Sequence, residues 1–575
     1  MRRPDVRNTV SSPNSASSDG RGVENATRKD DFDVIVAGAG PVGLVLAIDL
    51  GRRGVRTLLV EKDPTTKEWP KMDRSNARTM EIFRRLGFAE EVRELGYPAD
   101  ASMDVLVVTS LSQEPLTVLS YRTVAEHREQ IRQARDGSEP LEPYQLVSQN
   151  DLEPLLKSIA ESTDGVEVRF GCELVGFDQD DDGVSVQLRD ASGAASTVRA
   201  GYLVGCDGGV STVRKQLGIP LSGRGGISAL LQTTFASDEL YDKIPIGKGR
   251  HYYFADDQGA GIVVQGSRRQ FTLNLRGTDD DLDLEQEIRD RLGFDVDFTI
   301  VNHRRWKMHL LLADRYREGR VFIAGDAAHL VIPTGGLGMN TGIGDAIDLA
   351  WKLAGTVHGW GGPGLLASYE VERRAVGAHN VAAAGWAAEG MFLWQSQVRP
   401  EIREDGPEGA EARADVAKAA RDHHWRIYEM VGAELGYSYA GSALIATEDD
   451  DPGEWDTVHY TPHARPGVRL PHVWLRDGRA VQDVLGPDYA LLDLTGSADT
   501  AEIESAFAAL GAPLQVFRSD EPGARDVYGA PLLLVRPDLH VFWRGTELPD
   551  ADVLAAGATG HTVPSVRIPE LTEAS

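Results

Sequence analysis

The chain has 575 residues, of which 41% are hydrophobic and 26% charged, as is typical of a folded globular protein with about two to four domains. The formal net charge of −28 argues against a nucleic-acid partner, because phosphate neutralisation requires clustered Lys and Arg. The two cysteines, Cys172 and Cys206, are far apart in sequence, which fits a reducing cytoplasm and offers no metal cluster.

No window approaches the roughly 18 apolar residues of a membrane span, so we expect no membrane partner. The first 30 residues contain an arginine pair that no apolar run follows. A secretion signal needs such a run, so we expect residues 1–30 to form a disordered tail and the protein to be cytoplasmic.

The first ordered unit, residues 32–62, has the pattern of a βαβ unit. Residues 34–37 and 57–60 are apolar runs typical of buried parallel strands, and residues 41–50 have a helical pattern. The turn after the first strand reads Gly38-Ala39-Gly40-Pro41-Val42-Gly43, which matches GxGxxG. Gly38 permits the tight turn, Gly40 lets a pyrophosphate approach the helix N-terminus, and Gly43 allows close helix–strand packing.

Glu61 ends the second strand of this unit, where a carboxylate accepts a hydrogen bond from a ribose hydroxyl. The glycine motif, its position between strand and helix, and this acidic residue together predict dinucleotide binding. The alternative is a structural turn with a fortuitous glycine pattern.

Helical and strand patterns alternate along the rest of the chain. A helix is expected at about 77–86, strands at about 104–119, a helix that begins near Gln149, and strands to about residue 190. Strand patterns dominate from about 225 to 306, and a strand at 321–324 precedes a helix with apolar positions from Ile343 to Ala354. Residues 396–465 are charged and helix-prone, and the patterns from about Pro466 indicate one more small domain.

Three further motifs are better explained without a ligand. A second GxGxxG, at residues 359–364, follows a helix rather than a strand, and Pro363 suits the first turn of the next helix. Residues 178–183 read DQDDDG, but the twelfth position of a calcium loop starting there is Arg189 rather than Glu, so we expect a hairpin turn. His423 and His424 are adjacent and would point about 100° apart on a helix, so they cannot share a metal. We expect no metal site.

Two glycine-containing segments follow predicted strands later in the chain. Residues 205–214 read GCDGGVSTVR, in which a strand leads through Asp207 into a helix that starts near Ser211; alone, this is equally well explained as a capped turn. Residues 325–346 read GDAAHLVIPTGGLGMNTGIGDA, and such glycine density before a helix predicts that a ligand approaches the main chain. The free amides of that helix would stabilise negative charge on the ligand.

The combination of GxGxxG with Glu61, DGxxSxVR, and GDAAH followed by a proline and GGxGxN resembles the FAD-dependent aromatic hydroxylases of the p-hydroxybenzoate hydroxylase fold, over residues 32 to about 395. The last segment, with PGVRLPHVWLRDGRAVQDVLG and LLVRPDLHVFWRG, is similar to the thioredoxin-like C-terminal domain of the phenol hydroxylase branch, although it has no CxxC. The resemblance implies an α/β fold. A Rossmann-like FAD-binding domain at 31–395 would be interleaved with a mostly β substrate domain at about 100–120 and 220–306. A helical linker at 396–465 and a thioredoxin-like α/β domain at 466–575 would follow.

The resemblance also implies which residues bind the cofactor and which take part in catalysis. The implied cofactor-binding residues are Gly38, Gly40, Pro41, Val42, Gly43, Glu61, Lys62, Lys71, Gln149, Asp207, Asp326, Gly338, Met339 and Asn340. Pro333 matches a proline whose carbonyl borders the reaction site. Asp73, by its spacing from Arg78, matches an aspartate that faces the substrate and would act as a base toward a phenol. The alternative for Asp73 is a carboxylate on a surface loop.

The activity that the resemblance implies is an NAD(P)H-dependent hydroxylation. NAD(P)H reduces FAD, O2 adds to give a flavin C4a-hydroperoxide, and its distal oxygen attacks a phenolic ring. Because PTGGLGMNTGIGDA and YEVERRAVGAHN look close to hydroxylases that tailor aromatic polyketides, that substrate class is favoured over a simple phenol of the phenol, chlorophenol or resorcinol type. A protein that keeps FAD as a structural ligand without hydroxylase activity is the alternative of another class. We expect a monomer or a homodimer.

Overall fold

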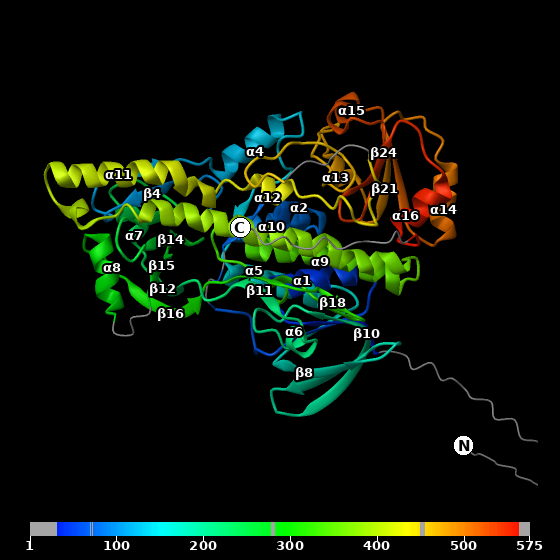
Figure 1. Cartoon of the computed structure of the whole chain (residues 1–575), viewed down its shortest axis with the longest axis horizontal. Coiled ribbons are helices and arrows are strands. Elements are labelled where there is room, and N and C mark those ends of the chain that lie inside the picture. Colours follow the sequence, from blue (N-terminus) through cyan, green and yellow to red (C-terminus); the bar gives the residue numbers. More distant parts are fainter. Residues whose placement is uncertain (1–30, 69–70, 72, 278–281, 449–454, 563–575) are drawn as a thin grey trace, which may run out of the picture.

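The computed structural model describes residues 31–68, 71, 73–277, 282–448 and 455–562. The predicted tail at residues 1–30 lies outside the described residues. The described part is elongated: a central layered domain lies between a β-rich domain at one end and a small α/β domain at the other (Figure 1). None of the described helices is long and apolar enough to cross a membrane.

The central domain is built on an eight-stranded sheet with the core order β18-β19-β10-β1-β2-β7. β1 (Phe32–Ala37) pairs in parallel with β2 (Thr57–Glu61) and with β10 (Ala195–Gly205), which pairs in parallel with β19 (Val321–Ile323). Residues 34–36 of β1 are completely buried, as expected for a parallel strand covered on both faces. The other strands are β7 (Val166–Phe170), β8 (Cys172–Gln179), β9 (Val184–Asp190) and β18 (Arg317–Glu318). The predicted hairpin turn joins β8 to β9.

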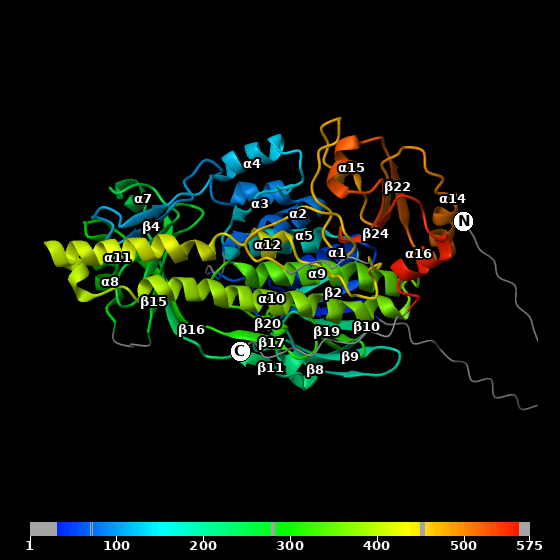
Figure 2. The ribbon, with the colours of Figure 1, turned by 45° about the horizontal axis from the view of Figure 1, so that its top comes forward.

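Long helices run across this sheet. α1 (Pro41–Arg52) follows β1 and packs on α9 (Leu337–Val357), and α10 (Pro363–Gln395) lies beside α9 (Figure 2). The predicted corner at residues 359–364 joins α9 to α10, and Pro363 is the first residue of α10. Shorter helices of this domain are α2 (Ala77–Arg85), α3 (Ala89–Leu95), α4 (Val124–Gln133), α5 (Gln149–Ser162) and α6 (Thr212–Gln216).

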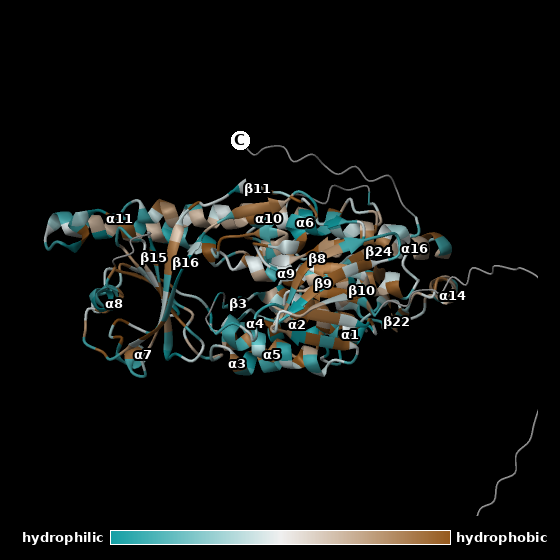
Figure 3. Cartoon of the chain, turned by 90° about the horizontal axis from the view of Figure 1, so that it is seen from below, coloured by the Kyte–Doolittle hydropathy of each residue, from teal (hydrophilic) through white to brown (hydrophobic). Residues whose placement is uncertain are grey.

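The β-rich domain is a seven-stranded sheet of order β16-β12-β15-β14-β13-β4-β5. Two separate chain segments build it, as predicted for an interleaved domain: β4 (Val105–Val108) and β5 (Thr117–Leu119) come from the first. The second contributes β12 (Ala229–Ala236), β13 (His251–Phe254), β14 (Gly261–Val264), β15 (Gln270–Arg276) and β16 (Thr299–Lys307). Figure 3 shows this sheet apart from the apolar strands of the central sheet, with α7 (Leu240–Lys243), α8 (Leu284–Leu292) and α11 (Pro407–His423) around it.

Small sheets and short helices join these domains. β3 (Arg74–Ser75) pairs with β6 (Gln145–Leu146), and β17 (Leu310–Ala313) pairs with β11 (Leu221–Arg224) and β20 (His329–Leu330). In the predicted linker, α11 is followed by η3 (His424–Ile427) and α12 (Val431–Leu435). The linker therefore returns the chain to the central domain, because α12 packs on α2.

The last domain has a four-stranded sheet of order β22-β21-β23-β24. β21 (Tyr489–Asp493) is parallel to β22 (Leu514–Arg518) and antiparallel to β23 (Leu532–Val535), which pairs with β24 (Val541–Gly545). Its helices are α13 (Val481–Val484), α14 (Ala501–Ala509), α15 (Pro522–Tyr528) and α16 (Ala551–Ala558).

Arg536, which follows β23, anchors this domain to the central one. Its guanidinium lies 3.0 Å from Asp348 of α9 and 2.8 Å from Glu372 of α10, and all three side chains are buried. Removing one partner of such a buried ion pair leaves an uncompensated charge, so this contact ties the two domains tightly.

Candidate active site

The turn from β1 into α1 has the geometry that a pyrophosphate requires. Gly38 has φ +102°, and a Cβ there would lie 2.4 Å from the carbonyl oxygen of Cys206. A Cβ on Gly43 would lie 2.0 Å from the Gly38 carbonyl oxygen, so neither glycine tolerates a side chain. A Cβ on Gly40, by contrast, meets nothing within 4 Å. No side chain caps α1, so the amides of its first turn, among them that of Val42, face this open space.

Glu61, at the end of β2, stabilises this turn by hydrogen bonding to its main chain. Its Oε2 accepts a hydrogen bond from the main-chain N–H of Ala39 at 2.9 Å, and its Oε1 accepts one from Asp63 at 3.0 Å. A carboxylate offers about four lone-pair sites, so both oxygens can still accept from a ribose hydroxyl. Lys62 is exposed beside it, and Pro41 is the first residue of α1. The predicted AMP-binding residues therefore lie around one helix N-terminus.

Lys71 and Asp326 come together although they are 255 residues apart. The Nζ of Lys71 lies 2.9 Å from the Oδ2 of Asp326. The carboxylate raises the pKa of the Lys71 ammonium. Burial alone would raise the pKa of Asp326, but the charges of Lys71 and His329 hold it below its usual range. Both groups are therefore charged, and each can contact a polar part of a cofactor.

Asp207 caps α6. It accepts hydrogen bonds from the hydroxyl of Ser211 at 2.5 Å and from the main-chain N–H of Thr212 at 2.7 Å. Arg214 of the same motif donates to the carbonyl of Ala327 at 3.0 Å, which fixes the motif to the loop that carries Asp326. The role of Asp207 toward FAD or NAD(P)H stays a prediction.

Gln149 is the first residue of α5 and is buried. Its amide donates to Glu153 at 2.5 Å, and Glu153 in turn accepts from the main-chain N–H of Lys67 at 3.0 Å. Gln149 thereby orders the segment before Lys71, and its contact with the flavin stays a prediction.

The segment before α9 turns through two glycines with left-handed backbone. Gly335 has φ +85° and Gly336 has φ +64°, and the N–H of Gly336 donates to the carbonyl of Pro333 at 3.1 Å. No side chain caps α9, so its first amides, including those of Gly338 and Met339, have no side-chain acceptor. A long helix with an uncapped N-terminus stabilises negative charge placed there, as a reduced flavin ring requires.

Asn340 fixes this helix start to the neighbouring strand β3. Its Oδ1 accepts from the main-chain N–H of Asn76 at 3.0 Å, and its Nδ2 donates to the carbonyl of Arg74 at 2.9 Å. Both side-chain atoms are thus committed to the protein, so Asn340 positions the segment that carries Asp73. Its predicted contact with the cofactor, which would involve the backbone, is untested.

Asp345, which sequence reasoning missed, holds the loop of Asp326. This buried carboxylate accepts from the main-chain N–H of Gly325 at 3.1 Å, and His329 and Arg373 each contact it at 2.8 Å. The available signal in the sequence is the repeat of GDA, at residues 325–327 and again at 344–346.

Asp73 forms an ion pair with Arg250, the residue just before β13. The side chain of Arg250 is 2% exposed and that of Asp73 is 24% exposed, so the carboxylate is partly buried against the arginine. Arg250 also lies over the ring of Tyr97 at 5.2 Å. Its Nε and Nη1 are buried and find no hydrogen-bond partner among the described residues. Leaving two buried nitrogens of a guanidinium without partners is costly, so these nitrogens are candidate donors to a ligand.

A group of aromatic side chains lies beside Arg250, whose charge interacts with Tyr253 and Tyr428; we call Tyr121, Tyr144, His251, Tyr253, His424 and Tyr428 the aromatic cluster. Within it, ring centroids of Tyr253 and His424 are 4.4 Å apart, and those of His251 and Tyr428 are 5.5 Å apart. Tyr253 and Tyr428 also pack with Ile332 and Leu337, which flank the glycine turn before α9. The cluster therefore lies between the β-rich sheet and the predicted flavin-ring end.

Both histidines of the cluster are neutral. Burial lowers the pKa of His424 to about 3 and, with the nearby Arg250, lowers that of His251 well below its usual value. The Nδ1 of His424 accepts a hydrogen bond from the Nε1 of Trp394 at 2.9 Å, so its Nε2 carries the proton. That Nε2 has no partner among the described residues. It is a free buried donor.

Sequence reasoning missed Arg250, His251, His424 and Tyr428. The pattern HYYF predicts a strand, but aromatic side chains in a strand usually pack in a core, so they give no sign of a site. The adjacent pair His423-His424 excludes a shared metal and gives no sign of a substrate contact. These residues come from separate elements, so no spacing in the sequence joins them.

Family models match both the central part of the chain and its last domain. A family model described as FAD binding domain matches residues 31–384, and one described as aromatic-ring hydroxylase, C-terminal, matches residues 463–560. The FAD-dependent monooxygenase apdD of Emericella nidulans is 33% identical, covering 92% of this chain and 90% of that protein. Aklavinone 12-hydroxylase DnrF of Streptomyces peucetius is 35% identical (81% and 92%), and 2,4-dichlorophenol 6-monooxygenase of Cupriavidus pinatubonensis is 32% identical (93% and 96%).

Solved structures of flavin-dependent enzymes are also similar to the chain. The rebeccamycin biosynthetic enzyme RebC with reduced flavin has a TM-score of 0.83 at 33% identity, covering 92% of this chain and 99% of that one. A ternary complex of aklavinone-11 hydroxylase with FAD and aklavinone has a TM-score of 0.77 at 30% identity (92% and 98%). The predicted fold class, FAD cofactor and enzyme class are confirmed. The chain belongs to the FAD-dependent aromatic-ring hydroxylases and is a flavoprotein monooxygenase with NAD(P)H as co-substrate.

Proposed function

We propose that this enzyme hydroxylates a polycyclic phenol of the aromatic polyketide type, bound at the aromatic cluster. The observation that carries the proposal is the Asp73–Arg250 ion pair, because two buried nitrogens of this guanidinium have no partner among the described residues and its charge interacts with Tyr253 and Tyr428 of that cluster. A phenolate oxygen satisfies such donors better than any neutral group. FAD, when bound, supplies the oxygen-transfer chemistry.

Asp73 and Arg250 divide the activation of the phenol between them. Asp73 is the carboxylate beside the proposed phenol site and takes the phenolic proton. Arg250 donates to the phenolate oxygen and stabilises its charge, which makes the ring a better nucleophile. Arg250 is a catalytic residue in this proposal, and Asn340 positions the segment of Asp73.

The two neutral histidines favour a substrate with further oxygens. The free Nε2 donor of His424 suits a ketone or quinone oxygen, and phenol and the chlorophenols have no second oxygen to accept from it. The six rings of the aromatic cluster supply flat apolar surface for a fused ring system. The relatives that hydroxylate aklavinone, such as DnrF, support this class.

A catabolic hydroxylase of simple phenols is the second candidate, because the 2,4-dichlorophenol 6-monooxygenases are also similar to the chain. The two are separated by measuring NAD(P)H oxidation by FAD-loaded protein with a hydroxyanthraquinone and, in parallel, with phenol, 2,4-dichlorophenol and resorcinol. We expect strong stimulation by the polycycle only, with one oxygen added to the product. Stimulation by a monocyclic phenol alone would contradict the polyketide proposal.

We propose a cytoplasmic enzyme, because two cysteines in 575 residues fit a reducing compartment. We also propose that it is a monomer or a homodimer.

A further inference from the structure

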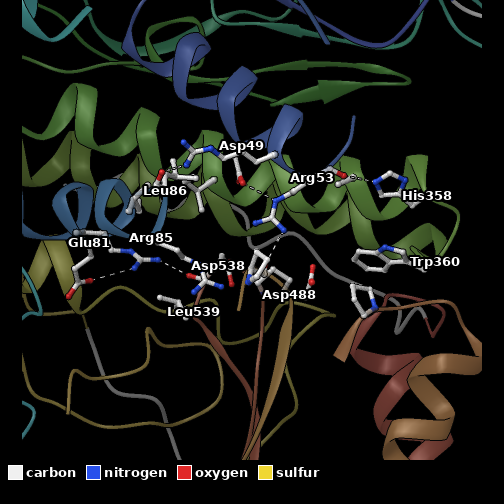
Figure 4. Close-up of a pocket in the computed structure, with 18 residues that line it drawn as sticks. Asp49, Arg53, Glu81, Arg85, Leu86, His358, Trp360, Asp488, Asp538 and Leu539 are labelled. Carbon is white, nitrogen blue, oxygen red and sulfur yellow. Dashed lines mark hydrogen bonds and ion pairs between the residues drawn. The ribbon is translucent and has the colours of Figure 1, made fainter. Parts of the chain in front are cut away.

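A cavity of about 300 Å³ lies where the last domain meets the central domain (Figure 4). Its walls come from the C-terminal end of α1, from α2 and α9, and from residues 487–488 and 537–539 of the last domain. Gly40, at the phosphate end, directly precedes α1, and this cavity lies at the opposite end of that 12-residue helix, about 18 Å away at 1.5 Å per residue. None of the residues assigned above to FAD or substrate lines it.

Four arginines line this cavity: Arg52, Arg53, Arg78 and Arg85. Arg53 pairs with Asp49 at 3.0 Å. Arg85 instead donates to the carbonyls of residues 485 and 486, and Arg52 to that of residue 86. Among the residues that the structure describes, neither Arg52 nor Arg85 forms an ion pair with a carboxylate. The Nε of Arg78, a residue 6% exposed, has no partner there either.

The carboxylates of the lining do not balance these cations. Two of the four, Glu81 and Asp538, are neutralised from outside the cavity. Arg469 binds Glu81 at 2.6 Å, and Arg536 binds Asp538 at 2.6 Å. Glu81 also forms an ion pair with Arg78 of the lining at 3.6 Å. Asp49 and Asp488 are the lining carboxylates left to face Arg52, Arg53 and Arg85, so the cavity carries an excess of positive charge.

Among the four arginines, Arg85 is the one whose pKa is lowered most. Burial, together with the neighbouring Arg53, lowers the pKa of Arg85 to about 10. Its charged form is thus disfavoured where it stands, and an anion beside it would restore the balance.

We propose that this interdomain cavity binds a small oxyanion, a phosphate or carboxylate group, with Arg85 as its main contact and Arg52 as its second. A volume of about 300 Å³ corresponds to roughly ten waters, which is enough for a phosphate ester or a small dicarboxylate. The ligand would hold the last domain against α1 and α2, because both sides of the interface contribute walls. The site does not depend on the proposed substrate.

Calorimetric titration of the FAD-loaded protein tests this proposal, because bound FAD keeps added phosphate out of the pyrophosphate site. Inorganic phosphate and succinate are titrated separately, with chloride at equal ionic strength as the blank. We expect one site for at least one of them, and Arg85→Gln should weaken it at least about tenfold, as expected for losing a charge-assisted contact. Arg128→Gln, an exposed arginine paired with Glu90, is the matched control and should bind as the unmodified enzyme does.

Arg52→Gln serves the same purpose if Arg85→Gln does not fold. Binding of phosphate alone or of succinate alone identifies the ligand group and supports the site in either case. The proposal is overturned if neither anion binds at millimolar concentration. Binding that Arg85→Gln and Arg52→Gln leave unchanged would also overturn it.

Discussion

Arg250 is the residue on which the proposed chemistry most depends. It is almost fully buried, it is paired with Asp73, and two of its nitrogens lack partners among the described residues. Burying a guanidinium in this state is unfavourable unless something else satisfies it. A substrate oxygen at that place therefore gains binding energy in proportion to its negative charge, which is largest once the phenol has ionised.

Replacing Arg250 by Met should lower kcat/KM for the aromatic substrate by about 100-fold, the loss typical of removing a donor to a developing oxyanion. The affinity for FAD should be unchanged, since Arg250 lies in the β-rich domain. Steady-state oxidation of NAD(P)H and titration with FAD measure the two effects. Arg289→Met, an exposed arginine paired with Glu285 on α8, is the control. Equal losses in both variants would refute the assignment.

Asp73→Asn separates the proton transfer from the ion pair, because Asn can still accept from Arg250 but cannot take a proton. We expect a larger loss of kcat at acidic pH than at alkaline pH, where the phenol ionises without help. The pH profile of kcat measures this. A variant that hydroxylates normally across the whole range would remove Asp73 from the mechanism.

The residues of the nucleotide end were predictable, and those of the substrate end were not. Gly38, Gly43 and Glu61 lie within one βαβ unit, so local spacing reveals them. Arg250, His424 and Tyr428 meet only because the β-rich sheet and the linker fold back onto the central domain. Their partners are distant in sequence, and a pattern read along the chain does not contain that information.

At the scale of elements, two helix N-termini provide the sites for negative charge. α1 begins at the turn that faces open space at Gly40, and α9 begins after the glycine turn at residues 335–336. Neither start is capped by a side chain. The helix periodicity predicted both elements, but α9 extends six residues upstream of Ile343, to Leu337, because the glycines of this segment permit helix as well as turn.

Gly40→Ala and Gly43→Ala should fail in different ways. A Cβ at position 40 meets no protein atom, so the variant should fold normally but lose FAD affinity at least about tenfold, since the methyl group enters the space for the phosphates. A Cβ at position 43 meets the Gly38 carbonyl at 2.0 Å, so that variant should lose about 1–3 kcal/mol of stability even without FAD. Thermal unfolding and fluorescence titration with FAD measure both. Unchanged FAD affinity in Gly40→Ala would contradict the phosphate site.

At the scale of the whole molecule, buried ionisable groups connect the domains. Arg536 of the last domain pairs with Asp348 and Glu372, and Arg469 pairs with Glu81 of α2. The last domain is thus bound by charge as well as by packing. The sequence indicated this domain by its strand and helix patterns, but not these contacts, because an isolated arginine gives no sign of a partner in another domain.

Stability should fall as the pH drops from about 6.5 to 5. Burial lowers the pKa of His424 to about 3 and those of His472 and His540 to about 4, so these histidines stay neutral in the folded state while the unfolded chain takes up protons. Each then costs about 2 kcal/mol at pH 5. Asp348, whose pKa burial raises, acts in the opposite direction and offsets part of this loss.

Thermal unfolding of the FAD-loaded enzyme between pH 5 and 7 measures this loss. His424→Gln should reduce the loss by about 2 kcal/mol, and His459→Gln, at an exposed position, should not change it. A midpoint of unfolding that is independent of pH in this window would show that the histidines are not held neutral.

The transfer of one oxygen atom from O2 to a phenolic ring is the reaction on which every role above depends. It is measured by mass spectrometry of the product formed by FAD-loaded enzyme, NADPH and ¹⁸O2 with a hydroxyanthraquinone. We predict substrate-stimulated oxidation of NADPH and a product that carries one ¹⁸O atom. Oxidation of NADPH that yields only hydrogen peroxide with every aromatic tested, or no stimulated oxidation at all, would contradict it.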